Sequence, residues 1–162
     1  MKKLQKLTLK QLENEMTVIG SDEQREMFGG YDNDCFWQCV AYMRNDTDVD
    51  ALVLDYYVNT LGYTEAEADA YLSSNGASVQ LVDIPNYYAY LGCDYDPDFS
   101  DGKYIVIFNN DDVEAYVSDG GSHAVVITGS NADGTLNYYD PQSGGAGVFS
   151  SADANNLTYA GY

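Results

Sequence analysis

Two of the three cysteines, Cys35 and Cys39, lie four residues apart in the stretch YDNDCFWQCVAYM, where a helix is expected to begin. Four residues make about one helical turn, so the two thiols would share one face of that helix. Backbone N–H groups and the helix dipole favour a thiolate at the first helical residue, which is the position of Cys35. The same N–H groups can stabilise the oxyanion of a tetrahedral intermediate. Cys35 is therefore the candidate nucleophile, and Cys39 is expected to pack one turn deeper.

A base for this thiol can come from the single histidine, His123, which begins the β-branched run HAVVITG. A lone histidine is more often an ordinary, partly buried residue than a catalyst. Asp140 makes a catalytic role for His123 more plausible, because Asp140 ends TLNYYD, the strand expected to return from the turn NADG at 131–134. In such an antiparallel hairpin, residue 123 pairs with a position near 140 or 142, so Asp140 can orient the imidazole. Cys35, His123 and Asp140 would then form an acyl-transfer triad.

The two blocks also resemble a known family. DCFWQCVAYM resembles the nucleophile helix, DC-x-x-x-C-x-A-x-hydrophobic, of the bacteriocin-processing peptidases in the papain-like superfamily. HAVVITGSNADGTLNYYDPQSG resembles that family's histidine strand, its turn and the Asp-Pro end of the next strand, with Asp140 17 positions after His123. The resemblance covers most of residues 31–149. It implies that Cys35 is the nucleophile, His123 the general base and then acid, and Asp140 the orienting residue, with a peptide-like substrate and no cofactor.

The chain departs from this family at two positions next to the nucleophile. The family completes its oxyanion hole with a glutamine six residues before the cysteine, where this chain has Gly29, so Asn33 or Gln38 would have to substitute. The family has glycine directly after the cysteine, where this chain has Phe36, which would narrow the cleft. A register based on papain itself would instead make Cys39 the nucleophile, with Asn33 six residues before it.

Two kinds of function follow from these observations. One is a cysteine peptidase or related amide hydrolase, including an amidase that cuts the stem peptides of peptidoglycan. The other is a secreted binding or antagonist protein on a papain-like fold whose triad is inactive. The departures beside the nucleophile favour the second, whereas the order of cysteine, histidine and aspartate favours the first.

The first 30 residues differ in composition from the rest. They hold five of the seven basic residues against five acids, so residues 31–162 carry the whole formal charge of −19. This segment resembles the double-glycine leader of peptides exported by ABC transporters with their own peptidase domain, with cleavage after Gly29-Gly30. Its upstream apolar residues would be Met16, Ile19 and Met27. The resemblance implies a leader at 1–30, a peptidase domain at 31–162, and a cytoplasmic precursor that is secreted. The alternative is a pair of amphipathic helices ended by a glycine cap.

Composition excludes several partners. A strongly acidic chain repels nucleic acid and anionic lipid, and no apolar run is long enough to cross a bilayer. The aspartate-rich stretch 94–102 lacks the glycine and glutamate positions of an EF-hand calcium loop, so no metal is expected.

The expected fold is α+β, with helices first and an antiparallel sheet second. Apolar spacing and capping residues predict helices over 35–44, 49–62, 64–75 and after Pro85 to Gly92. Short β-branched runs predict strands at 103–108, 123–129 and 135–140, with an edge strand near 147. The family resemblance implies that this arrangement is papain-like.

Overall fold

A computed structural model describes residues 33–79, 84–92, 102–113 and 121–162. The chain divides into two units, Met1–Gly30 and Tyr31–Tyr162, and all that follows concerns the second. The predicted leader, with Gly29 and Gly30, lies outside the described residues, as does the acidic stretch at 94–101.

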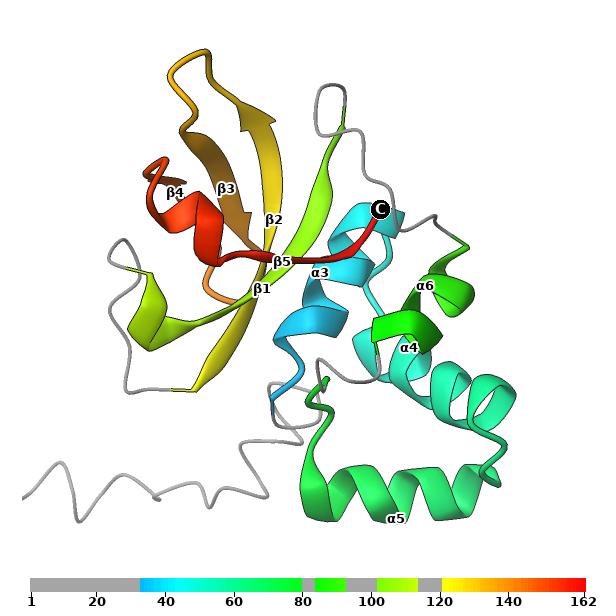
Figure 1. The fold of residues 1–162 in the computed structure, drawn as a ribbon. Helices are drawn as coiled ribbons and strands as arrows, with labels where there is room; N and C mark the ends of the chain where they lie inside the picture. The colour runs from blue at the N-terminus through cyan, green and yellow to red at the C-terminus, as the bar shows by residue number, and fades with distance from the viewer. Residues whose placement is uncertain (1–32, 80–83, 93–101, 114–120) are drawn as a thin grey trace, which may run out of the picture. The chain divides into compact units, whose positions relative to one another are not determined.

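Helices occupy the first half of the described chain (Figure 1). Their bounds are α3 Cys35–Arg44, α4 Val49–Asp55, the π-helical turn η1 Tyr56–Thr60, α5 Glu65–Asn75 and α6 Ile84–Leu91. A capping box begins α5, because Thr64 and Glu67 each bond the other's backbone N–H. The predicted bounds of α3 and α5 are confirmed. The helix predicted over 49–62 is instead an α-helix that widens into a π-helical turn at Tyr56.

The second half forms a five-stranded antiparallel sheet in the order β4-β3-β2-β1-β5. Its strands are β1 Tyr104–Asn109, β2 Ser122–Ser130, β3 Leu136–Asp140, β4 Gly145–Phe149 and β5 Thr158–Gly161. The hairpin β2–β3 and the edge strand β4 occur where the sequence predicts them. The sequence did not predict β5, a strand of four residues that pairs with β1 at the other edge.

Alternate residues of β1 and β2 face two different cores. One face contributes Ile105, Ile107, Ala124 and Val126 to a core shared with the helices, including Phe36 and Trp37 of α3. The opposite face packs against Phe149 of β4 and residues near β5. Because α3 lies against the sheet (Figure 1), the start of α3 and the start of β2 can contribute to one site. The α+β class is thus confirmed.

Trp37 anchors α3 to the other helices. Its side chain is fully buried, and its Nε1 donates a hydrogen bond of 3.1 Å to the carbonyl oxygen of Ala77. Its ring contacts Tyr56 of η1 and Tyr87 of α6, with centroids 5.2 and 5.9 Å away. None of the helices in the described ranges is both long and apolar enough to cross a membrane.

Candidate active site

Cys35 is the first residue of α3 and is half-buried against the helical core. Burial raises the pKa of its thiol, and backbone hydrogen bonds from Ala124 and Phe36 to the sulfur oppose that shift without cancelling it. Ala124 directly follows His123 in β2, so its contact with the sulfur joins the start of α3 to the histidine-bearing end of β2. The two elements that the sequence predicts to carry nucleophile and base therefore meet at Cys35.

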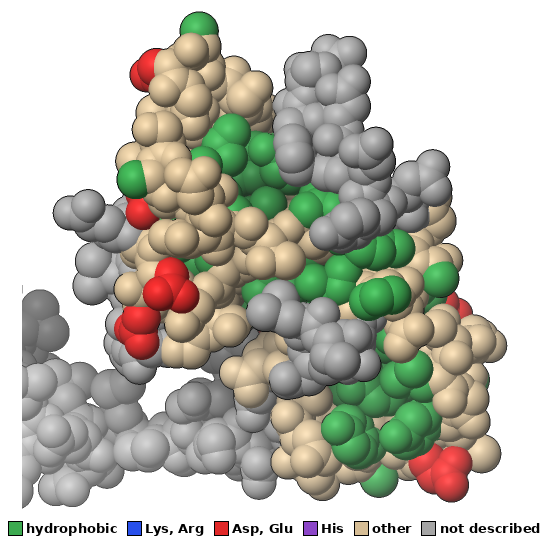
Figure 2. Space-filling view, viewed as in Figure 1, with side chains coloured by type: hydrophobic (Ala, Val, Ile, Leu, Met, Phe, Trp, Pro, Cys, Tyr) green, Lys and Arg blue, Asp and Glu red, His purple; other side chains and the backbone are tan. Residues whose placement is uncertain are grey.

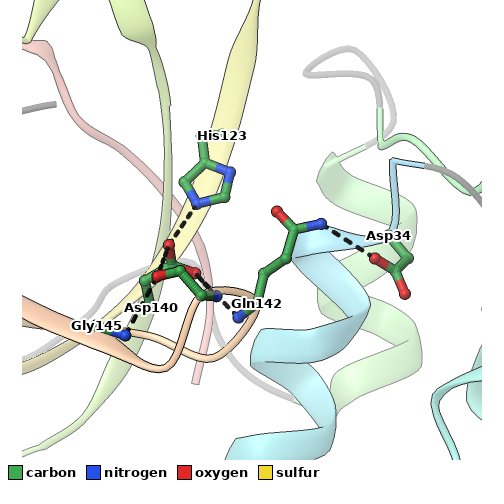
Figure 3. Close-up of polar contacts among 6 residues, drawn as sticks. Asp34, His123, Asp140, Gln142 and Gly145 are labelled. Carbon is green, nitrogen blue, oxygen red and sulfur yellow. Dashed lines mark hydrogen bonds and ion pairs between the residues drawn. The ribbon is translucent and has the colours of Figure 1, made fainter. Parts of the chain in front are cut away.

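His123 is the second residue of β2, and its side chain is nearly buried. Its Nε2 lies 3.2 Å from Oδ2 of Asp140, as Figure 3 shows. The hairpin register explains this contact: Val126 pairs with Tyr139, so one further step places Asp140 opposite Val125. His123 and Asp140 are then diagonal neighbours on one face of the sheet. The other ring nitrogen, Nδ1, points toward the side of the site where α3 begins.

Asp140 is held in place by the turn that follows it. Its Oδ2 accepts a hydrogen bond of 2.7 Å from the Ser143 hydroxyl, and its Oδ1 accepts one of 3.0 Å from the backbone N–H of Gln142. The carboxylate is only 2% exposed, so these donors replace the water it has lost. The turn DPQS thus fixes the carboxylate that faces the imidazole.

A polar bridge connects this turn to α3. The side chain of Gln142 reaches across the site, and its Nε2 donates a hydrogen bond of 3.4 Å to Oδ1 of Asp34 (Figure 3). Asp34 is the N-cap residue of α3, yet its side chain makes no capping hydrogen bond. It instead accepts a hydrogen bond of 2.9 Å from Nε2 of Gln38. Burial raises the pKa of Asp34 above its ordinary value, although hydrogen bonds from Gln38 and Gln142 oppose the shift.

The electrostatics of Cys35 correct one expectation from the sequence. Burial raises the pKa of the thiol, and the nearby charges of Asp34 and Asp140 raise it further. These effects exceed the favourable backbone hydrogen bonds, so the thiol pKa is not lowered by its place at the helix start. Activation of Cys35 would therefore require a base during the attack rather than a standing thiolate.

Cys39 is a poor candidate in the alternative papain register. Its side chain is 0% exposed, and burial raises the pKa of its thiol well above the ordinary value. Asn33, the oxyanion candidate of that register, is exposed and has a left-handed backbone with φ of 59°. Both observations favour Cys35 as the nucleophile.

The structure separates the oxyanion candidates. The amide of Gln38 is engaged by Asp34, and Asn33 lies in the turn before the helix. Gln142, which the sequence did not single out, places its amide beside Asp34, the residue that precedes Cys35. Its only sequence signal is its place two residues after Asp140, where an Asx turn aims the side chain back into the site.

Comparison with protein-family models, with curated proteins and with solved structures finds no match. The family resemblance of the two sequence blocks therefore stays a prediction. Within the described ranges, no group of three or more His, Cys, Asp or Glu side chains could hold a metal ion.

The raised pKa of Cys35 predicts how it reacts with iodoacetamide. Because the thiolate is the reactive form, the alkylation rate should rise with pH through a midpoint above the ordinary thiol value of about 8.5. Cys39 should react more slowly at every pH, since it is buried. Peptide mass spectrometry measures both rates in the folded protein. A Cys35 midpoint well below 8.5 would show that burial does not govern this thiol.

Proposed function

We propose that residues 31–162 form a cysteine hydrolase that cleaves an amide bond in a peptide or peptide-like substrate. The observation that carries this proposal is the 3.2 Å contact between His123 and Asp140, located where the backbone of Ala124 meets the Cys35 thiol. A nucleophile, a base and a group that orients the base are the parts that covalent acyl transfer needs. The proposed fold is papain-like, as the sequence blocks suggest.

The chemistry can be written with a neutral thiol at the start. The Cys35 proton passes to Nδ1 of His123 as the sulfur attacks the carbonyl carbon, and Asp140 stabilises the imidazolium through Nε2. The imidazolium then gives that proton to the leaving nitrogen as the C–N bond breaks, which leaves a thioester on Cys35. His123 next accepts a proton from water as the water oxygen attacks the thioester. It returns that proton to the Cys35 sulfur as the C–S bond breaks, which releases a carboxylic acid and restores the free thiol.

The oxyanion of this reaction needs hydrogen-bond donors near the start of α3. Backbone N–H groups in the first turn of α3 can supply one, because helices leave these donors without partners inside the helix. We assign the role of second oxyanion donor to the side-chain amide of Gln142. This amide would exchange its long hydrogen bond of 3.4 Å to Asp34 for a hydrogen bond to the substrate oxygen. A Gln142→Ala variant should therefore lower kcat, whereas Gln38→Ala should leave kcat within a few-fold.

The substrate class can be tested with purified 31–162. Synthetic peptides, including one that spans the chain's own 20–35 segment, are compared with muropeptide fragments by mass spectrometry. Cleavage of either class that disappears in Cys35→Ala supports the hydrolase. No cleavage of any substrate, together with the same Cys35 alkylation profile in wild type and His123→Ala, would favour a binding protein.

The leader assignment remains part of this proposal. We infer that an ABC transporter with a peptidase domain recognises residues 1–30, cleaves after Gly30 and exports the domain. Gly30 lies only five positions before Cys35, so a single molecule could hardly fold its own leader back across its site. Secreted protein that begins at Tyr31 is the expected result, and concentration-independent release of 1–30 from the pure chain would contradict it.

A second candidate is a secreted binding or antagonist protein with an inactive triad. The raised pKa of Cys35 and the occupied amides of Gln38 and Gln142 favour it, since each opposes catalysis. The two functions differ in one measurable property. In a hydrolase the reactivity of Cys35 toward an acyl donor depends on His123, whereas in an antagonist it does not.

A further inference from the structure

Away from the triad, tyrosines line a pocket of about 180 Å³ between η1 and α5. Its wall includes Tyr57 of η1, Tyr63 of the following turn and Tyr71 of α5, together with the polar side chains of Asn75 and Ser78. We call this the tyrosine pocket. Among the described residues, no basic or acidic side chain lines it, so the described wall consists of aromatic faces and neutral polar groups.

The three tyrosines form a connected aromatic surface. Ring centroids lie 5.6 Å apart for Tyr57 and Tyr63, 5.6 Å for Tyr57 and Tyr71, and 6.0 Å for Tyr63 and Tyr71. Tyr63 is 37% exposed and Tyr71 is 42% exposed, so both rings present part of their surface to solvent. Figure 2 shows hydrophobic side chains gathered over α5, with acidic side chains at the edge of the group.

The backbone beside the pocket is also unusual. The π-helical turn η1 contains Tyr56 and Tyr57, and the N–H of Leu61 bonds to the carbonyl of Tyr56, five residues earlier. The carbonyl of Tyr57 accepts the N–H of Tyr63, which fixes these two pocket residues to each other. Such π turns are uncommon and occur frequently at functional sites. The widened turn therefore points to a binding role, independently of the exposed rings.

The molecule itself indicates which ligand suits these rings. The sequence beyond residue 30 contains two basic residues, and each lies over a tyrosine face: Arg44 is 5.1 Å from the ring centre of Tyr90, and Lys103 is 4.9 Å from that of Tyr42. In the part of the chain that the structure describes, neither of these two basic residues lines the tyrosine pocket. Cations are attracted to aromatic faces because the ring quadrupole is negative there.

Charge adds to this preference. The chain carries a formal −19, all of it beyond residue 30, which raises the local concentration of cations. Glu67 is exposed and lies one helical turn before Tyr71. Its carboxylate accepts the backbone N–H of Thr64 in the capping box, and Thr64 directly follows Tyr63 in the chain. A carboxylate at this edge would favour a cation in the pocket over a neutral group of the same shape.

We propose that the tyrosine pocket binds a small organic cation, of which a quaternary ammonium group is the best match. Three observations support this ligand. The tyrosine rings are partly exposed, a carboxylate lies one helical turn from Tyr71, and the pocket volume suits a headgroup rather than a whole drug-sized ligand. The proposal does not rest on the hydrolase, because no triad residue lines the pocket. Its ligand would be recognised whether or not Cys35 is reactive.

The test uses choline and its neutral carbon isostere, 3,3-dimethylbutan-1-ol, titrated against 31–162. Proton NMR follows the methyl groups, which ring currents shift upfield when they enter the pocket. Choline should show saturable shifts and the isostere at least about fivefold weaker binding, since it lacks the charge. Equal binding of the two would overturn the cation proposal in favour of a general apolar pocket, and no saturable shift with choline would overturn it outright.

Variants identify the site. Tyr71→Leu should weaken choline binding about tenfold, while Tyr71→Phe, which keeps the aromatic face, should bind nearly as wild type. Glu67→Gln keeps a side chain that can form the capping box, so its expected loss of a few-fold reports the charge. The matched control is Tyr42→Leu, since Tyr42 is 37% exposed against 42% for Tyr71 and does not line the pocket. A loss in Tyr42→Leu equal to that in Tyr71→Leu would contradict the assignment.

A last arm distinguishes the sources of such a cation. Phosphatidylcholine vesicles that sediment with the protein, and release it when choline is added, would show that the pocket takes the group from a lipid headgroup. Choline binding in solution without co-sedimentation would show that the ligand is a soluble ammonium compound. Sedimentation that choline does not reverse would contradict recognition of the headgroup by this pocket.

Discussion

Replacing Cys35 with alanine should reduce amide hydrolysis to background, a loss of at least about 10³-fold in kcat, because the other described thiol, Cys39, is fully buried. The side chain is half-buried at a helix start and alanine suits that position, so the domain should remain folded. Steady-state rates with the best substrate of the panel measure the loss, and thermal unfolding monitors the fold.

Cys39→Ala is the matched control, since it removes a thiol one turn away in the same helix. Its buried sulfur contributes packing, so this variant should lose stability but keep kcat within a few-fold on the folded fraction. Full activity in Cys35→Ala would contradict the assignment. Loss of activity in a folded Cys39→Ala, with Cys35→Ala active, would support the papain register instead.

Replacing Asp140 with asparagine should lower kcat by about 10²- to 10⁴-fold, because a neutral amide cannot stabilise the imidazolium that forms on His123. The same change should move the alkylation midpoint of Cys35 downward, because the charge of Asp140 raises the thiol pKa in the native site. An Asp140→Asn variant with a lower alkylation midpoint of Cys35 and a lower kcat would show that the Asp140 carboxylate orients and stabilises His123. A merely structural carboxylate would not produce this combination.

Ser143→Ala separates the carboxylate from its support. This variant loses the 2.7 Å hydroxyl bond to Asp140 but keeps the charge and the 3.0 Å bond from the N–H of Gln142. Its kcat should fall about tenfold or less, and the Cys35 midpoint should change little. Equal losses in Ser143→Ala and Asp140→Asn would show that the turn geometry, rather than the charge, governs the rate.

Local sequence signals predicted the parts of the fold that depend on near neighbours. The capping box at Thr64 and Glu67 predicted the start of α5, and the NADG turn predicted the β2–β3 hairpin. The hairpin register in turn explains why His123 and Asp140 approach each other, since side chains on one face of a sheet alternate with a period of two.

Features that depend on distant parts of the chain were not predictable. The bond between Gln142 and Asp34 joins residues 108 positions apart, and β5 is stabilised by pairing with β1 rather than by its own four residues. Burial of Cys35 has the same origin, because the sheet that covers it comes about 90 residues later in the sequence. The helix dipole is a local effect and suggested a lowered pKa, but long-range burial outweighs it.

The most direct test of the account is whether Cys35 and His123 act as a pair. The 31–162 domain is mixed with an activated ester such as p-nitrophenyl acetate at neutral pH, and intact and peptide mass spectrometry locate any acetyl group. If His123 acts as the base for Cys35, acetylation of Cys35 should be rapid in the wild type and at least about 10²-fold slower in His123→Ala. Acetylation of Cys35 at the same rate in both proteins, or none in either, would contradict it and would leave the binding protein as the better description.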